Sequence, residues 1–121
     1  MNIQEDYVSF ETAKLLKEKG FDEECYTCYV IDEIQHYDYK SRNSELITGI
    51  ISAPTLQMAM KWLREKHNIH ITTVVENNGN YIGYLYRTTG ANIQGWDRRL
   101  SKTSYEEACE AAIKYCLENL I

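Results

Sequence analysis

The sequence has a single proline, Pro54, only two phenylalanines and no long apolar run. Its longest apolar stretch, Leu46 to Ile51, is interrupted by a threonine and a glycine, whereas a membrane-spanning helix needs about 20 apolar residues. The segment from Met1 to Tyr7 contains two acidic residues and no basic one, unlike the positively charged start of a secretory signal. We therefore expect a cytoplasmic protein that does not interact with membranes.

Positive charge is scarce in the first half of the chain. Residues 1–53 carry five Lys or Arg against eleven Asp or Glu, a net charge of −6, and residues 54–121 have a net charge of +1. Such a chain lacks the basic surface on which sequence-independent nucleic-acid binding depends. Arg98, Arg99 and Lys102 do cluster behind Trp96, but a solvated loop is the simpler interpretation of that cluster. We do not expect nucleic acid as a partner.

Ten tyrosines stand beside the two phenylalanines in this chain of 121 residues. Tyrosine combines apolar area with a hydroxyl group, which suits half-wet sheet faces and contact surfaces. The tyrosines therefore either fill the rim of a small core or form a binding surface. The length favours one domain over residues 1–121, with a core that needs no metal or disulfide.

Three segments have the apolar spacing that is typical of amphipathic helices. Ser9 is a suitable N-cap for the first, Phe10 to Lys19, and Gly20 can end it in the left-handed conformation. The second helix begins near Pro54 and stops near Asn68. Its expected core face consists of Leu56, Ala59, Met60 and Leu63.

The third helix is expected to follow Ser104, because Ser104 and Glu107 form an S-x-x-E capping box. Apolar residues recur along it at alternating spacings of three and four, the best amphipathic pattern in the chain. The expected inner stripe consists of Tyr105, Ala108, Cys109, Ala112, Ile113, Cys116, Leu117 and Leu120.

The four cysteines raise the question of a zinc site, because Cys25 and Cys28 have a familiar ligand spacing. Cys109 and Cys116 lie about 10 Å apart along a helix axis, which is too far to hold one tetrahedral ion together. The Cys25 and Cys28 pair enters a strand and not a helix N-terminus, where a redox thiolate is stabilised. We expect four buried, reduced cysteines, with no metal and no cofactor.

Two strands are expected in the first half, Tyr26 to Ile31 and Leu46 to Ile51, with the polar stretch Asp32 to Glu45 as a loop. A short strand is also possible around Gln94 to Leu100. With the hairpin described next, the element order is α-β-β-α-β-β-(β)-α. This order predicts an α+β fold, a two-layer domain with three helices packed on an antiparallel sheet.

The strongest signal in the sequence is a β-hairpin over His70 to Thr88. Two strand-like runs flank Asn78-Gly79, the pair favoured in a two-residue turn. The predicted register places Asn77 opposite Asn80, and His70 opposite Arg87. One face is more apolar and is expected to cover the helices. That face carries Ile71, Thr73, Val75, Ile82, Tyr84 and Tyr86.

No motif in the chain favours catalysis. The sequence has no G-x-S-x-G nucleophile, no phosphate-binding loop and no dinucleotide fingerprint. Glu106, Glu107 and Glu110 are paired carboxylates, but they serve the N-terminal dipole of the third helix in the simplest interpretation. We therefore expect that the protein is not an enzyme.

Three blocks of the sequence, Tyr7 to Asp22, Ala53 to Ile69 and Tyr105 through the C-terminal helix, resemble a known family. They look like small uncharacterised proteins from bacteriophages and prophages of gut Bacteroides relatives. The blocks cover the three predicted helices, and the segments between them vary in that family. The resemblance implies a phage or prophage origin, and it carries over no activity and no site residues.

Residues 70–120 are also similar to the HicB-type antitoxin domain, in which a hairpin and a Gly-containing loop precede an Ala-rich helix. Here Thr103 to Ala108 open that helix. The chain departs from the domain by placing a helix before the hairpin and by lacking its proline-glycine loop. The order of elements also resembles a double-stranded-RNA-binding domain, but glutamates stand where such a domain needs lysines.

The leading functional hypothesis is a non-enzymatic phage or prophage accessory protein that binds a host protein or a second copy of itself. Met58 and Trp62 are its candidate partner-binding residues, because they widen the apolar arc of the second helix, although a wide core stripe is the simpler interpretation. A HicB-like antitoxin is a further alternative.

A hypothesis from another class is a small-molecule sink or sensor for an anionic, nucleotide-like ligand. Arginine supplies a bidentate contact to an anion, and aromatic side chains supply a stacking plane. The candidate ligand-binding residues are His70, Tyr81, Arg87, Trp96 and Arg98.

Overall fold

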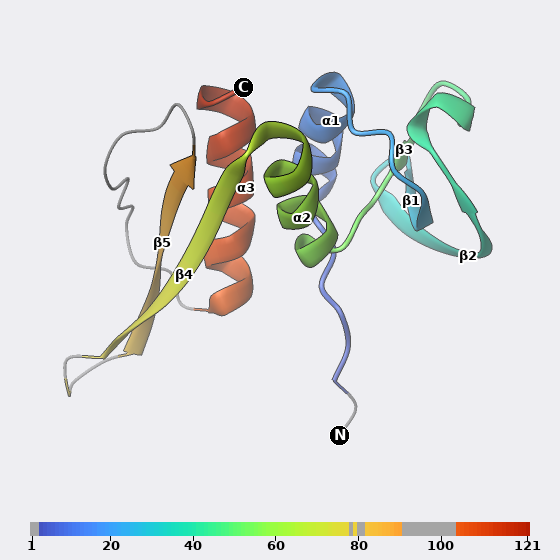
Figure 1. Cartoon of the computed structure of the whole chain (residues 1–121). Helices are drawn as coiled ribbons and strands as arrows, with labels where there is room; N and C mark the ends of the chain where they lie inside the picture. Colours follow the sequence, from blue (N-terminus) through green and yellow to red (C-terminus); the bar gives the residue numbers. More distant parts are fainter. Residues whose placement is uncertain (1–2, 78, 80–81, 91–103) are drawn as a thin grey trace. The chain divides into compact units, whose positions relative to one another are not determined.

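The computed structural model describes residues 3–77, 79, 82–90 and 104–121 (Figure 1). It has an α+β fold with helices α1 (Phe10–Glu18), α2 (Leu56–His67) and α3 (Tyr105–Asn119) and two antiparallel sheets. The predicted fold class and the three predicted helices are confirmed, although one sheet was expected. Among the described residues, none of the helices has the length and apolar character needed to cross a membrane.

Backbone contacts divide the chain into two compact units, Met1–Ala59 and Met60–Ile121, with the boundary inside α2. We call them the N-terminal unit and the C-terminal unit. The boundary also divides the charge, because residues 54–59 carry none and the N-terminal unit therefore keeps the net charge of −6. The single-domain organisation expected from the length stays a prediction.

The N-terminal unit contains a three-stranded sheet of order β2-β1-β3, made from β1 (Cys25–Val30), β2 (Glu33–Ser41) and β3 (Ile50–Ser52). The predicted loop from Asp32 to Glu45 is wrong, because it contains β2 and a single 3-10 turn. β2 is an edge strand with mostly exposed, polar side chains. Its pairing with β1 holds it in the sheet, and the polar composition is typical of a protected edge.

Local capping groups define α1 much as predicted. The Ser9 hydroxyl accepts a hydrogen bond from the Thr12 backbone N–H over 3.2 Å. At the other end Gly20 has a φ of 95°, and the Phe21 N–H donates to the Leu16 carbonyl over 2.9 Å. This is the Schellman ending expected for a glycine at that position.

Asn43 links the end of α1 to β3 in the N-terminal unit. Its side-chain amide donates to the Phe21 carbonyl over 2.8 Å, and its Oδ1 accepts from the Ser52 N–H over 2.9 Å. Asn43 is buried, so both hydrogen bonds are shielded from water. Unpaired partners would be costly there, which makes Asn43 a central structural residue of the unit.

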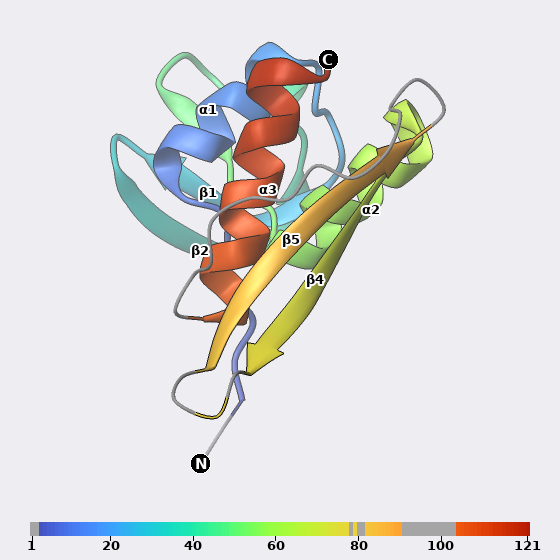
Figure 2. The ribbon, with the colours of Figure 1, turned by 90° about the vertical axis from the view of Figure 1, so that its left-hand side faces the viewer.

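The C-terminal unit is a hairpin of β4 (Ile69–Asn77) and β5 (Ile82–Gly90) with α3 packed against both strands (Figure 2). Thr73 Oγ1 lies 3.5 Å from Cys109 Sγ, and the ring centroids of Tyr86 and Tyr115 are 6.4 Å apart. Thr73 and Tyr86 therefore face the helix, as the hairpin pattern predicts.

The predicted register of the hairpin is wrong by two residues. Asn77 pairs with Ile82, whereas the prediction paired Val75 with Ile82. The predicted partner of Asn77, Asn80, lies outside the described residues. The Asn77 side chain accepts a hydrogen bond from the Gly79 N–H over 2.9 Å, a local turn that competes with the ladder. Because the shift is even, each side chain keeps its predicted face.

Coverage of the two hairpin faces differs from the prediction. Val75 and Ile82 are on the face that carries Thr73 and Tyr86, yet each is 59% exposed. On the opposite face Leu85 is buried. The apolar pattern thus identifies the faces, but it does not show how far α3 covers the inner one.

The core stripe of α3 is confirmed apart from its ends. The Ser104 hydroxyl accepts from the Glu107 N–H over 3.1 Å and caps the helix. Tyr105 is 41% exposed and Leu120 is half-buried, so these two predicted core positions are wrong. They lie in the terminal turns, at the ends of the buried stripe. The fully buried residues are Ala108, Cys109, Ala112, Ile113, Cys116 and Leu117.

Candidate functional site

The structure describes two of the five residues of the anion-binding hypothesis, His70 and Arg87. The other three, Tyr81, Trp96 and Arg98, lie outside the described residues. His70 is exposed, and its Nε2 lies 3.3 Å from the Asn68 Oδ1. Arg87 is opposite Thr72, so it is a diagonal and not a direct neighbour of His70 on the same face. Such diagonal positions are about 7–8 Å apart, which long side chains can span.

The four cysteines are free and buried, as predicted. Burial raises the pKa of Cys25 to about 12, with smaller contributions from the neighbouring Cys28 and Glu23. Burial also raises the pKa of Cys28, and the Ser41 hydroxyl partly offsets that effect. Nucleophilic attack and metal ligation both require the thiolate. The thiols of Cys25 and Cys28 are therefore protonated at neutral pH, which does not suit a nucleophile.

The candidate partner residues of α2 have different exposures. Trp62 is 5% exposed, and its ring packs edge-on against the His67 ring with centroids 4.7 Å apart. Met58 is 38% exposed. Trp62 therefore has little area to offer a partner, whereas Met58 presents its side chain at the surface.

Met58 borders a hollow of about 310 Å³ in the N-terminal unit. We call it the tyrosine hollow, because two of the residues around it are tyrosines. Acidic, basic and apolar groups share its lining. The residues that line it are Glu5, Tyr7, Glu24, Cys25, Tyr26, Thr27, Lys40, Pro54, Thr55 and Met58.

Backbone pairing brings two sides of the hollow together. Tyr7 forms an antiparallel bridge with Thr55, where the Val8 N–H donates to the Pro54 carbonyl over 3.0 Å and the Leu56 N–H donates to the Asp6 carbonyl over 2.9 Å. The Thr55 hydroxyl then accepts from the Met58 N–H over 3.1 Å and caps α2. Tyr7 and Met58 are thereby fixed at the same hollow.

A bulge between β1 and β2 forms the opposite side of the hollow. Between the pairs Cys25 with Ser41 and Thr27 with His36, β1 has only Tyr26, whereas β2 has the four residues 37–40. Tyr26 is 52% exposed, and the Lys40 Nζ lies 5.3 Å from its ring centroid. The bulge thus presents a tyrosine ring with a cation over it to the solvent.

Further aromatic contacts in this unit involve Tyr7 and residues of β2. The rings of Tyr7 and His36 meet edge-on with centroids 5.5 Å apart, and those of Tyr37 and Tyr39 are 5.3 Å apart. Tyr39 is 59% exposed. Tyr39 is therefore a surface group, whereas Tyr7 and Tyr37 are half-buried, and this exposure fits both the rim of a core and a binding surface.

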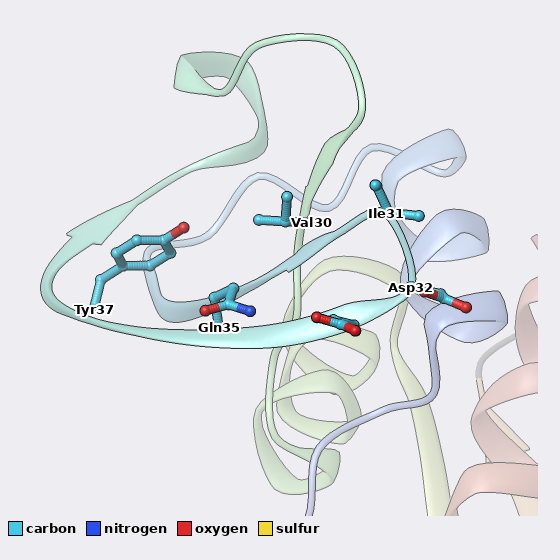
Figure 3. Close-up of a pocket in the computed structure, with 6 residues that line it drawn as sticks. Val30, Ile31, Asp32, Gln35 and Tyr37 are labelled. Carbon is cyan, nitrogen blue, oxygen red and sulfur yellow. The ribbon is translucent and has the colours of Figure 1, made fainter.

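A second hollow, of about 420 Å³, lies beside the turn between β1 and β2 (Figure 3). Val30, Gln35 and Tyr37 line it together with the turn residues Ile31 and Asp32 and the neighbouring Glu33. Its lining residues include no histidine, cysteine or serine, and the carboxylates Asp32 and Glu33 are exposed. Ile31 has a φ of 62° and is 76% exposed, which is unusual for a β-branched residue.

Sequence reasoning identified Met58 but missed Tyr7, Tyr26 and Lys40 as site residues. The tyrosine excess was the available signal, but Lys40 belongs to the strand that was predicted as a loop. Among the described residues, no group of three or more His, Cys, Asp or Glu side chains is arranged to hold a metal ion. Comparison of the chain with protein-family models, with curated proteins and with solved structures gave no match.

Proposed function

We propose that this protein is a non-enzymatic protein-binding module that contacts its partner through the tyrosine hollow. The observation that carries the proposal is the exposure of Tyr26 and Met58 around one hollow of about 310 Å³. Tyrosine and methionine are enriched at the centres of protein interfaces, where tyrosine supplies large rigid area. Methionine adapts its flexible side chain to an irregular partner surface.

The resemblance to phage and prophage proteins supports a setting for this activity. In that setting the module acts in the cytoplasm of a bacterial host and its partner is a host protein. The lack of catalytic motifs in the sequence and the raised pKa values of Cys25 and Cys28 support a binding role over an enzymatic one.

Site-specific photo-crosslinking tests this function. A photo-reactive phenylalanine replaces Tyr26 in one variant and Tyr105 of α3 in a matched control, since the two tyrosines are 52% and 41% exposed. After irradiation of host cells that express each variant, we expect a discrete crosslinked protein from position 26 only. A second substitution, Met58→Lys, should abolish that product while the circular dichroism spectrum is unchanged.

The same crosslinks from both positions, or none from position 26, would contradict the proposed contact surface. A product that survives Met58→Lys would show that the partner does not enter the hollow. Each of these outcomes can be read from one gel with mass spectrometry of the excised bands.

A second candidate function is binding of an anionic small molecule, and the placement of His70 and Arg87 on one face of the hairpin favours it. A thermal-shift screen of nucleotides tests it, because a ligand at 100 times its dissociation constant adds about 2.7 kcal/mol to stability. We expect any stabilising nucleotide to lose its effect in the Arg87→Gln variant. If no nucleotide raises the melting temperature, this candidate fails.

A further inference from the structure

The cation that already lies over Tyr26 indicates what the tyrosine hollow recognises. A separation of 5.3 Å between the Lys40 Nζ and the ring centroid is within the range of a cation–π contact. Lys40 is exposed, and among the described residues no carboxylate lies within ion-pair distance of it. The Tyr26 ring therefore already contacts a weakly held ammonium group.

The net charge of the N-terminal unit favours a cation from outside. Glu5 and Glu24 line the hollow, and Glu24 is 3.5 Å from Arg42 in an exposed ion pair. The N-terminal unit as a whole has a net charge of −6. A field of this sign attracts cationic ligands and repels phosphates. It thus disfavours nucleic acid and selects for basic protein segments.

We infer that the tyrosine hollow accepts an arginine side chain from a basic segment of the partner protein. In the free protein the Lys40 ammonium group occupies the position over the Tyr26 ring that this arginine takes in the complex. The inference rests on the proposed function and names the chemistry of its partner. Arginine suits the hollow better than lysine, because its planar guanidinium group stacks on tyrosine rings and pairs with carboxylates in a fork geometry.

Lys40 has a distinct role in this arrangement. Its ammonium group occupies the face of Tyr26 that the incoming guanidinium group needs, so it competes for the same ring. Because the side chain is long and exposed, another rotamer can place its ammonium group in solvent when the partner arrives. Removing the charge of Lys40 should therefore strengthen binding, an effect opposite to that expected for an ordinary contact residue.

Nuclear magnetic resonance of the full-length, nitrogen-15-labelled chain tests the inference. The probe is a blocked Gly-Gly-Arg-Gly-Gly peptide, and the control peptide carries the neutral isostere citrulline in place of arginine. We expect the arginine peptide to shift the backbone signals of Tyr7, Tyr26 and Met58, and the citrulline peptide to leave them unchanged. Equal shifts with both peptides would overturn the inference.

Matched variants separate the contributions of ring and charge. Tyr26→Phe should keep the affinity for the arginine peptide, whereas Tyr26→Leu should lose it. Lys40→Met should raise the affinity about 3-fold, as expected for removal of one exposed competing charge. Glu5→Gln should lower it, while Glu118→Gln on α3 serves as a control for general acidity. A Lys40→Met variant that binds more weakly would overturn the inference.

The outcomes distinguish this inference from the function on which it rests. If position 26 crosslinks to a partner but the arginine and citrulline peptides behave alike, the protein-binding function stands and the arginine specificity fails. If the arginine peptide shifts the backbone signals of the α3 glutamates as strongly as those of Tyr7, Tyr26 and Met58, the binding is nonspecific and the inference fails as well.

Discussion

The two units of the molecule are stabilised in different ways. In the N-terminal unit, side chains such as Asn43, Thr27 and Tyr29 hydrogen-bond to the backbone of distant segments. In the C-terminal unit, α3 buries a continuous apolar stripe, in which Ile113 and Leu117 are fully shielded from solvent. The comparison teaches that a small irregular sheet can be fixed by a few buried polar links, whereas a two-stranded hairpin depends on the helix that covers it.

The largest effect is expected from a cavity in the C-terminal unit. Ile113→Ala removes three buried carbon atoms from a fully buried position and should lower the free energy of unfolding by about 3 kcal/mol. Urea unfolding followed by circular dichroism measures this loss. The exposed Glu118→Ala substitution on the same helix should change stability by less than about 0.5 kcal/mol. Similar effects of the two variants would contradict the apolar account of this unit.

Next in size is the loss of the polar link in the N-terminal unit. Asn43→Ala leaves the Phe21 carbonyl and the Ser52 N–H without their described partner and should cost about 2–3 kcal/mol. Asn119→Ala is the matched control, because that asparagine is exposed at the end of α3. The same unfolding experiment compares them. A cost below about 0.5 kcal/mol for Asn43→Ala would mean that buried hydrogen bonds do not hold this unit.

A reciprocal pair of substitutions tests the backbone strain in each unit. Each unit has one non-glycine residue of positive φ among the described residues, Ile31 at 62° and Asn68 at 53°. Left-handed backbone costs an ordinary residue about 1–2 kcal/mol, and asparagine tolerates it best after glycine. Asn68→Ile should therefore destabilise the protein by about 1–2 kcal/mol, and Ile31→Asn should stabilise it by about 1 kcal/mol. Two changes of the same sign would refute the strain at Ile31.

The smallest effect at neutral pH comes from the titration of the Cys25 thiol, because this titration changes the free energy of unfolding only at alkaline pH. The folded thiol holds its proton up to a pKa of about 12, whereas an unperturbed thiol titrates near 9.0. The unfolded state therefore binds fewer protons in this window, and stability falls as the pH rises from about 9 toward 12. In Cys25→Ala the slope of unfolding free energy against pH should be shallower. Parallel slopes for the two proteins would show that burial does not raise this pKa.

The helices were predictable because their signals are local. The hydrogen bonds from Thr12 to Ser9 and from Glu107 to Ser104 join residues three positions apart, so both partners can be recognised within one short stretch of sequence. The glycine at the end of α1 is equally local. Short-range chemistry of this kind does not depend on how the rest of the chain folds.

The errors concern features that depend on distant partners. β2 is polar and forms a strand through its pairing with β1. The hairpin register differs from the prediction beside a turn in which the Asn77 side chain accepts a hydrogen bond from the Gly79 N–H. The tyrosine hollow joins Tyr7, Tyr26 and Met58 from three separate segments. Their common location follows from the backbone bridge and the bulge, and neither feature has a pattern in the sequence.

The bulge opposite Tyr26 has a consequence for the evolution of this surface. In a regular ladder, one inserted residue turns every later side chain to the other face. Here residues 37–40 lie between fixed pairs and outside the ladder, so an insertion among them leaves the pairing of Cys28 with Gln35 and with Ser52 unchanged. A chain with a longer or different segment at this position can therefore still fold the same sheet.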